Sequence, residues 1–147
     1  MSGKKYLIIL VAVIVVLFIW FGKTPTDYNL VIEKNSGEKI NLRVEIANTE
    51  IERGQGLSDR PSLAEQEGLL FVFPTADTYS FWTKDMHFAI DIIWLDDNWQ
   101  IVDITPNLAP ETFPKTFSPS SPAHYVLEVN AGFSATHNLN IGDKITF

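Results

Sequence analysis

Two apolar runs separated by a short polar segment form the middle of the chain and limit the folds that it can adopt. The runs are residues 69–73 and 88–95, and the polar segment, 83–85, reads Thr-Lys-Asp. The first run shows no alternation of polar and apolar residues, which is typical of a strand covered on both faces. Charges between two buried strands cost free energy unless they are paired, so segment 83–85 needs a structural or functional explanation.

Period-two alternation predicts strands in the rest of the chain. Residues 28–33 and 40–46 alternate on either side of an Asn-Ser-Gly turn at 35–37, and this pattern predicts an antiparallel hairpin. Five prolines between residues 105 and 122 predict a long surface loop. Further strands are predicted at 79–83, 90–95, 99–104, 125–129 and 144–147, which with 69–73 and the two strands of the hairpin makes about eight strands.

Only short helices are expected. Thr49 and Glu52 form a capping box that starts a helix, and the glycines at 54–56 end it. Residues 62–65 repeat the capping pattern, and 132–139 suit another short helix. Because no long amphipathic helix links the strands, the predicted fold is mainly β, a small antiparallel barrel or sandwich with two or three short helices.

Residues 6–22 carry no charge and predict a transmembrane helix that precedes the β domain. As a helix they reach about 25 Å, close to the lower limit for crossing a bilayer. Lys4 and Lys5 precede them, which predicts a cytoplasmic N-terminus. A cleaved signal peptide is the alternative, but residues 18–23 contain no Ala-x-Ala-like cleavage site. Either interpretation places the β domain outside the cytoplasm.

These features divide the chain into four parts. We predict a cytoplasmic tail at 1–5, a membrane anchor at 6–22, a linker at 23–27 and the β domain at 28–147. The chain has no cysteine, which excludes disulfides and thiol chemistry. The net charge is −7, and −10 without Lys4, Lys5 and Lys23, so the domain repels polyanions and nucleic-acid binding is not expected.

Lys84, Asp85, His87 and Asp91 form the first group of candidate site residues. In an extended segment Asp85, His87 and Asp91 share one face and offer oxygen and nitrogen ligands. Metal sites usually need three or four ligands with supporting hydrogen bonds, so we expect no metal and no cofactor. The structural alternative is that Lys84 pairs with a carboxylate and His87 lies in water.

Arg53, Arg60, Asp91 and Glu128 form the second group. Strongly apolar residues border both carboxylates, so burial of either one would require a partner. Arginine is the expected partner because its planar guanidinium binds a carboxylate through two hydrogen bonds. A structural ion pair is favoured over an acid/base pair, although an exposed Glu128 on a wet sheet face is also consistent with alternation.

Aromatic residues are the remaining signal. Phe81, Trp82, Trp94 and Trp99 lie within twenty residues, and burial in the core is the simplest interpretation. An exposed Trp82 beside Lys84 would instead suit a platform for a small ligand. No nucleophile elbow, phosphate-binding loop, zinc-protease motif or dinucleotide-binding glycine pattern is present.

The segments 53–60, 68–73, 81–86, 90–93 and 126–132 together resemble the DUF192 family, also called UPF0127. The resemblance runs from about residue 30 to the C-terminus. It implies a small, mainly β, barrel-like domain that is often exported or membrane-anchored, and it implies no activity. The chain departs from the family pattern at Asp85, where the family usually has Asn. The matching residues are Arg53, Gly56, Leu57, Arg60, Gly68, Phe71, Phe73, Phe81, Trp82, Lys84, Asp91, Glu128 and Gly132.

Three functions are consistent with these observations. The first is a membrane-anchored module that binds a small ligand or an envelope protein through Arg53, Trp82, Lys84, Asp85, Asp91 and Glu128. The second is a hydrolase-like enzyme in which Asp91 or Glu128 is the acid/base and Lys84 or Arg53 stabilises an anion. The third is a structural module without a pocket.

Overall fold

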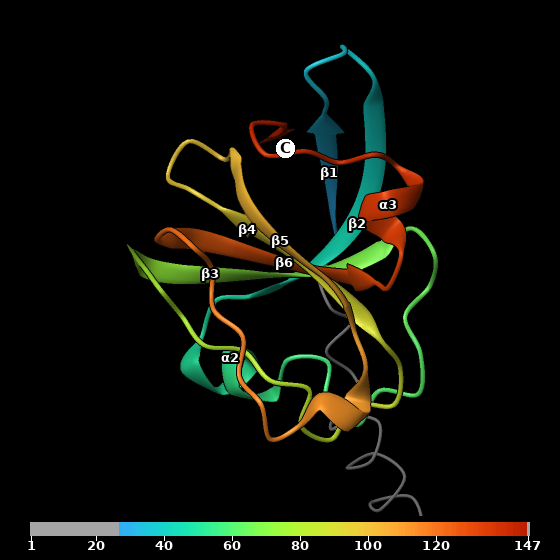
Figure 1. Cartoon of the computed structure of the whole chain (residues 1–147), viewed down its shortest axis with the longest axis vertical. Helices are drawn as coiled ribbons and strands as arrows, with labels where there is room; N and C mark the ends of the chain where they lie inside the picture. Colours follow the sequence, from blue (N-terminus) through green and yellow to red (C-terminus); the bar gives the residue numbers. More distant parts are fainter. Residues whose placement is uncertain (1–26, 147) are drawn as a thin grey trace, which may run out of the picture.

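A computed structural model describes residues 27–146, and seven strands in it form one curled sheet (Figure 1). The strand order is β5-β4-β6-β3-β2-β1-β7. The strands are β1 (Tyr28–Glu33), β2 (Lys39–Ala47), β3 (Glu67–Asp77), β4 (Ile90–Leu95), β5 (Ile101–Leu108), β6 (Ala123–Asn130) and β7 (Lys144–Thr146). The helices are α2 (Glu50–Gln55), α3 (Phe133–Thr136) and the 3-10 turn η1 (Pro110–Thr112).

The prediction of a mainly β fold is confirmed and that of a barrel is confirmed in part, whereas the sandwich alternative and the wholly antiparallel pairing are wrong. The strands form one sheet, and β2 pairs with β3 in parallel. The edge strands meet at one end, where Ile101 N donates to Asp143 O at 2.9 Å and Gln100 bridges Lys144. The result is a half-barrel closed only at that end.

The parallel pair requires a crossover between β2 and β3, and α2 lies within it. The capping box is confirmed, since Glu52 N donates to Thr49 Oγ1 and Thr49 N donates to Glu52 Oε2. The helix predicted at 62–65 is wrong. Glu67 N instead donates to Ala64 O at 3.1 Å, and this turn leads directly into β3, so no residues are left for a helical turn.

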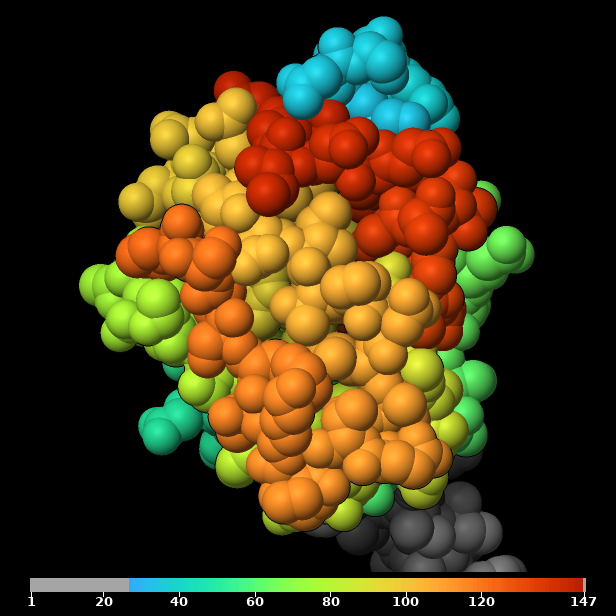
Figure 2. All heavy atoms as spheres, in the orientation of Figure 1, coloured from blue at the N-terminus to red at the C-terminus, as the bar shows by residue number. Residues whose placement is uncertain are grey.

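Two prolines lie inside strands that were predicted to end before them. Pro74 belongs to β3, at the register shift between Val72 and Asp77, where no ladder hydrogen bond needs its nitrogen. Pro106 belongs to β5, which is an edge strand. The rest of the proline-rich segment, 109–122, forms the predicted surface loop (Figure 2). The strand predicted at 79–83 is reduced to a single bridge between Phe81 and Phe117.

Both faces of the sheet are covered, which explains why the central strands lack alternation. The inner face of the curl packs the hairpin, α3 and β7 around residues such as Leu42, Leu127 and Phe133. The outer face packs residues of the crossover and of the loops, such as Leu57 and Phe81, against Phe71 and Trp94. Figure 1 shows α2 and these loops below the central strands β3, β6 and β4, with β1 and α3 above them.

The predicted tail, the anchor at 6–22 and the linker up to residue 26 lie outside the described residues. Within residues 27–146, no helix has the length and apolar character needed to cross a bilayer.

Candidate functional site

A pocket of about 310 Å³ opens on the outer face of the sheet, beside α2. Its walls come from α2 and the residues 56–58 that follow it, from β3, from residues 79–82, from Met86 and from Glu128 of β6. Gly56 has a φ of +52°, and a Cβ there would lie 3.3 Å from the ring of Phe71, so glycine lets the backbone approach the wall closely. The volume lies near the lower end of the range for small-ligand sites, about 300–1,000 Å³.

Aromatic rings form most of the apolar wall. The rings of Phe71 and Phe81 pack edge to face with 4.9 Å between their centres, and those of Phe73 and Tyr79 stack with 3.6 Å between their centres. Trp82 lines the mouth and is 54% exposed. The exposed Trp82 agrees with the platform interpretation, whereas Phe71, Phe73 and Tyr79 were not proposed as site residues. For Phe71 and Phe73 the match to the family pattern was the one available signal, and for Tyr79 there was none.

Glu128 is the buried ionisable group of the pocket. Its cross-strand neighbours on the outer face are Leu69 of β3 and Ile92 of β4, so it lies in an apolar environment and is only 4% exposed. Burial raises the pKa of Glu128 from 4.5 to about 8, and the positive charge of Arg60 opposes that rise. Among residues 27–146 no group forms a hydrogen bond with its Oε2 atom.

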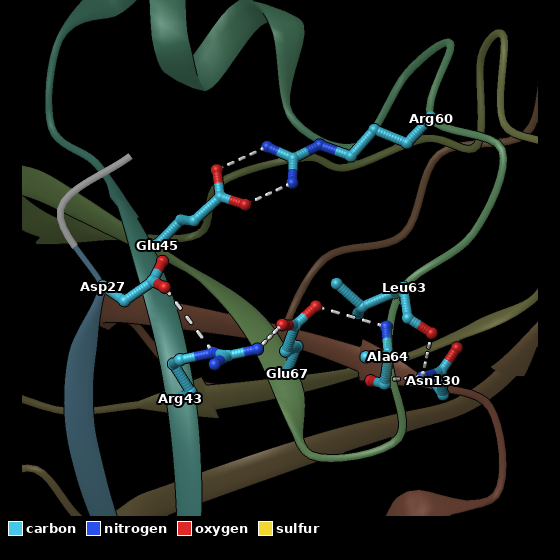
Figure 3. Close-up of polar contacts among 8 residues, drawn as sticks. All are labelled: Asp27, Arg43, Glu45, Arg60, Leu63, Ala64, Glu67 and Asn130. Atoms are coloured by element: carbon cyan, nitrogen blue, oxygen red, sulfur yellow. Dashed lines mark hydrogen bonds and ion pairs between the residues drawn. The ribbon is translucent and has the colours of Figure 1, made fainter. Parts of the chain in front are cut away.

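Arg60 does not bind Glu128 because Glu45 holds it. The Arg60 Nη1 and Nη2 atoms donate to the two carboxylate oxygens of Glu45 at 2.6 and 2.8 Å (Figure 3). The predicted arginine–carboxylate geometry is therefore present, with a partner from β2 that was not predicted. Nearby, Arg43 of β2 binds Glu67 of β3 and so connects the two parallel strands (Figure 3). The Arg43 Nε atom also lies 3.6 Å from Asp27 Oδ2, just before β1.

Arg53 lies at the α2 side of the pocket and binds backbone oxygens. Its Nη1 atom donates to Asn48 O at 2.6 Å and to Val72 O at 2.9 Å, and its guanidinium lies 5.2 Å from the centre of the Phe73 ring. These contacts join α2 to β3. Arg53 thus contributes a fixed positive charge to the pocket wall.

Asp91 lies on the opposite face of the sheet from Glu128. It pairs with Val129 in the ladder, whereas Glu128 pairs with Ile92, and adjacent residues of a strand point to opposite faces. Asp91 is fully buried and accepts backbone N–H groups from Asn107, Gly132 and Ser134 at 2.9, 3.1 and 2.8 Å. Three donors from two segments indicate a structural role for this carboxylate.

Lys84 and Asp85 lie in an exposed turn and do not line the pocket. Lys84 Nζ is 3.9 Å from Asp85 Oδ2, and both side chains are more than half exposed. The turn is held through its backbone, since Ser58 Oγ donates to Lys84 O at 2.9 Å. Water solvates these charges, so the charges of segment 83–85 need no buried partner. His87 is also exposed, and residues 27–146 contain no cluster of three potential metal ligands.

The pocket therefore combines aromatic walls, one guanidinium and one buried carboxyl group. At neutral pH the raised pKa keeps Glu128 largely protonated, so it can donate a hydrogen bond or release its proton to accept one. Such an arrangement suits the binding of a small molecule, and it also provides a group capable of general acid catalysis.

Comparison with known proteins places the chain among relatives without a stated activity. Residues 31–147 match the DUF192 family, described as "Uncharacterized ACR". A UPF0127 protein of Pyrococcus furiosus is 32% identical over 111 residues, which cover 74% of this chain and 90% of the relative. A UPF0127 protein of Thermococcus sibiricus is 31% identical over 121 residues, covering 79% and 73% of the two chains.

Two crystal structures are similar to the fold. One, from Sinorhizobium meliloti and described as "a putative transcription regulator", has a TM-score of 0.79, 27% identity and coverage of 82% of this chain and 93% of that chain. The other, a protein of unknown function from Novosphingobium aromaticivorans, has a TM-score of 0.77, 27% identity and coverage of 82% and 85%.

Proposed function

The chain belongs to the DUF192 (UPF0127) family, and we propose that it is a binding module that takes a small ligand in the aromatic pocket at Glu128. We further propose that residues 6–22 anchor this module to a membrane, with residues 28–147 outside the cytoplasm. The observation that carries the binding proposal is the partnerless Oε2 atom of a buried Glu128 in a concave, aromatic-walled pocket. A ligand would supply the missing hydrogen bond.

An enzymatic function is the second candidate, and the raised pKa of Glu128 supports it. A carboxyl group that titrates near 8 holds its proton at neutral pH and is suited to act as a general acid. Asp91 has less support as the acid/base, because it points to the other face and binds three backbone groups. Lys84 lies outside the pocket lining, so Arg53 is the cation available to an anion there.

The measurement for the binding proposal is a thermal-shift screen of the full chain against small amines, alcohols and carboxylic acids. Compounds that raise the melting temperature of the wild type are expected to lose at least half of that shift in Trp82→Ala, because the indole is part of the pocket mouth. Tyr28→Ala is the matched control, since Tyr28 is a similarly exposed aromatic of β1 outside the pocket lining. Equal shifts in both variants would contradict the proposal, and turnover of a bound compound would favour the enzyme.

The location proposal rests on the uncharged segment 6–22 and the preceding lysines. Protease added to spheroplasts is expected to digest the C-terminal domain while a cytoplasmic marker protein stays intact. A version of the chain without residues 1–22 is the control and is expected to remain protected inside the cell. Protection of the full-length domain in intact spheroplasts would overturn the proposed location.

The acidic charge of the chain is the reason that we do not propose nucleic acid as a partner. The description "a putative transcription regulator" applies to the Sinorhizobium protein, and our proposal for this chain does not include that role.

A further inference from the structure

We propose that the ligand of the pocket is a small organic cation whose ammonium group donates hydrogen bonds to the side chain of Glu128. This inference rests on the proposed binding function and adds the chemical class of the ligand. It starts from two observations: Glu128 is one of the residues that line the pocket, and its buried Oε2 atom has no hydrogen-bond partner among the described residues.

The aromatic walls favour a positive charge. The faces of Phe, Tyr and Trp rings carry negative electrostatic potential and attract cations within about 6 Å. The structure contains an example of this contact in the same pocket, where the guanidinium of Arg53 lies 5.2 Å from the centre of the Phe73 ring. Trp82 and Phe81 also line the pocket, so further rings surround a ligand there.

The charges around Glu128 are few, and Arg60 is already paired. Arg60 comes from the crossover and is bound by both oxygens of Glu45, so it exerts only a long-range attraction on Glu128. Arg53 and Glu50 of α2 also line the pocket. Arg53 donates to two backbone carbonyls, whose partial negative charges offset part of its repulsion of a second cation.

An ammonium group gains more from Glu128 than a neutral group does. A charge-assisted hydrogen bond is roughly twice as strong as a neutral one, and the surrounding Leu69 and Ile92 exclude water that would weaken it. The carboxyl group must first lose its proton, so the binding of a cation is coupled to the release of that proton to solvent. Proton release is therefore the property that separates a cationic ligand from a neutral hydrogen-bond acceptor, which would keep Glu128 protonated.

The test uses three probes that share one ring and differ in one end group: 2-phenylethylamine, 2-phenylethanol and phenylacetate. Isothermal titration calorimetry of the full chain in detergent, with a blank of empty micelles, is expected to give at least tenfold tighter binding of the amine than of the other two. Titrations in two buffers of different ionisation enthalpy are expected to show release of roughly one proton at pH 7. The affinity for the amine is expected to rise roughly tenfold from pH 6 to pH 7.

Two variants make the result specific. Glu128→Gln keeps the size of the side chain and is expected to abolish both the preference for the amine and the proton release. Glu65→Gln makes the same change at an exposed position outside the pocket and is expected to bind like the wild type.

The outcomes separate this inference from the proposed function. If the alcohol or the carboxylate binds as tightly as the amine, or if the amine binds without releasing a proton, the cation inference is wrong and the pocket still binds ligands. If Trp82→Ala and Glu128→Gln leave the binding of every probe unchanged, the binding lies elsewhere and the proposed function fails as well. If no probe and no compound of the thermal-shift screen binds the folded wild type, both proposals fail.

Discussion

The Glu128→Gln variant is expected to gain stability over the wild type as the pH rises, by roughly 2–4 kcal/mol between pH 5 and pH 8. The folded pKa of Glu128 is raised to about 8 because burial disfavours the carboxylate. In the unfolded chain the group titrates near its ordinary value, so between these two pKa values the folded state holds a proton that the unfolded state has lost. The stability of the wild type therefore falls across that window and levels off above about pH 8.

Glutamine does not titrate, so the variant lacks this loss. The buried amide adds its own cost, but that cost is independent of pH and shifts the whole curve by a constant. The measurement is urea denaturation of the full chain at half-unit intervals from pH 5 to pH 9, with Glu65→Gln as the control for removing an exposed carboxylate. A difference between Glu128→Gln and wild type that stays constant over this range would mean that Glu128 is ionised in the folded protein at neutral pH.

Local sequence signals predicted the elements whose determinants are close together in the chain. The hairpin of β1 and β2 is confirmed because its alternation and its turn lie within twenty residues, and its register aligns Leu30 with Leu42 on one face. The capping box at Thr49 is confirmed for the same reason. The pairing of β2 with β3 was missed, because a parallel pair has no local turn signal and depends on where the crossover packs.

The candidate site was predicted in part. Apolar neighbours raised the burial of Asp91 and Glu128 as one alternative, and both are buried, but the sequence could not show that they face opposite sides of the sheet. That property depends on the register of β4 against β6, where a shift of one residue would reverse it. The partner of Arg60 was missed for a related reason, since Glu45 comes next to it only through the parallel pairing of β2 with β3.

The exposure of Lys84 and Asp85 could not be predicted from the sequence for a different reason. Their position between two apolar runs indicated a burial problem, yet the chain leaves the sheet after β3 and returns only at β4, so the charged turn lies at the surface. Thr83 is the buried polar residue of this segment, and its hydroxyl lies within hydrogen-bonding distance of Pro110 O and Thr112 Oγ1. A loop that folds against a second loop carries no periodic pattern from which this could be predicted.

The Asp91→Ala variant is expected to lose roughly 3–5 kcal/mol of stability, the largest loss that we predict for a single polar side chain. The substitution leaves the N–H groups of Asn107, Gly132 and Ser134 without their acceptor, and those groups connect the end of β5 and the start of α3 to β4. Asp91→Asn is expected to recover only part of the loss, because its amide nitrogen would face one of the three donors.

Asp103→Ala is the matched control, since the Asp103 Oδ2 atom accepts one N–H group from another segment, that of Ser120, at 2.7 Å. The Asp103→Ala variant is expected to lose about 1 kcal/mol of stability. Urea denaturation at pH 7 measures all three variants. If Asp91→Ala unfolds at the same urea concentration as the wild type, the three hydrogen bonds do not organise the sheet end, and the assignment of Asp91 to structure rather than chemistry would have to be reversed. A stable Asp91→Ala protein that no longer binds pocket ligands would also contradict the structural assignment, which places Asp91 on the face opposite Glu128 and outside the pocket lining.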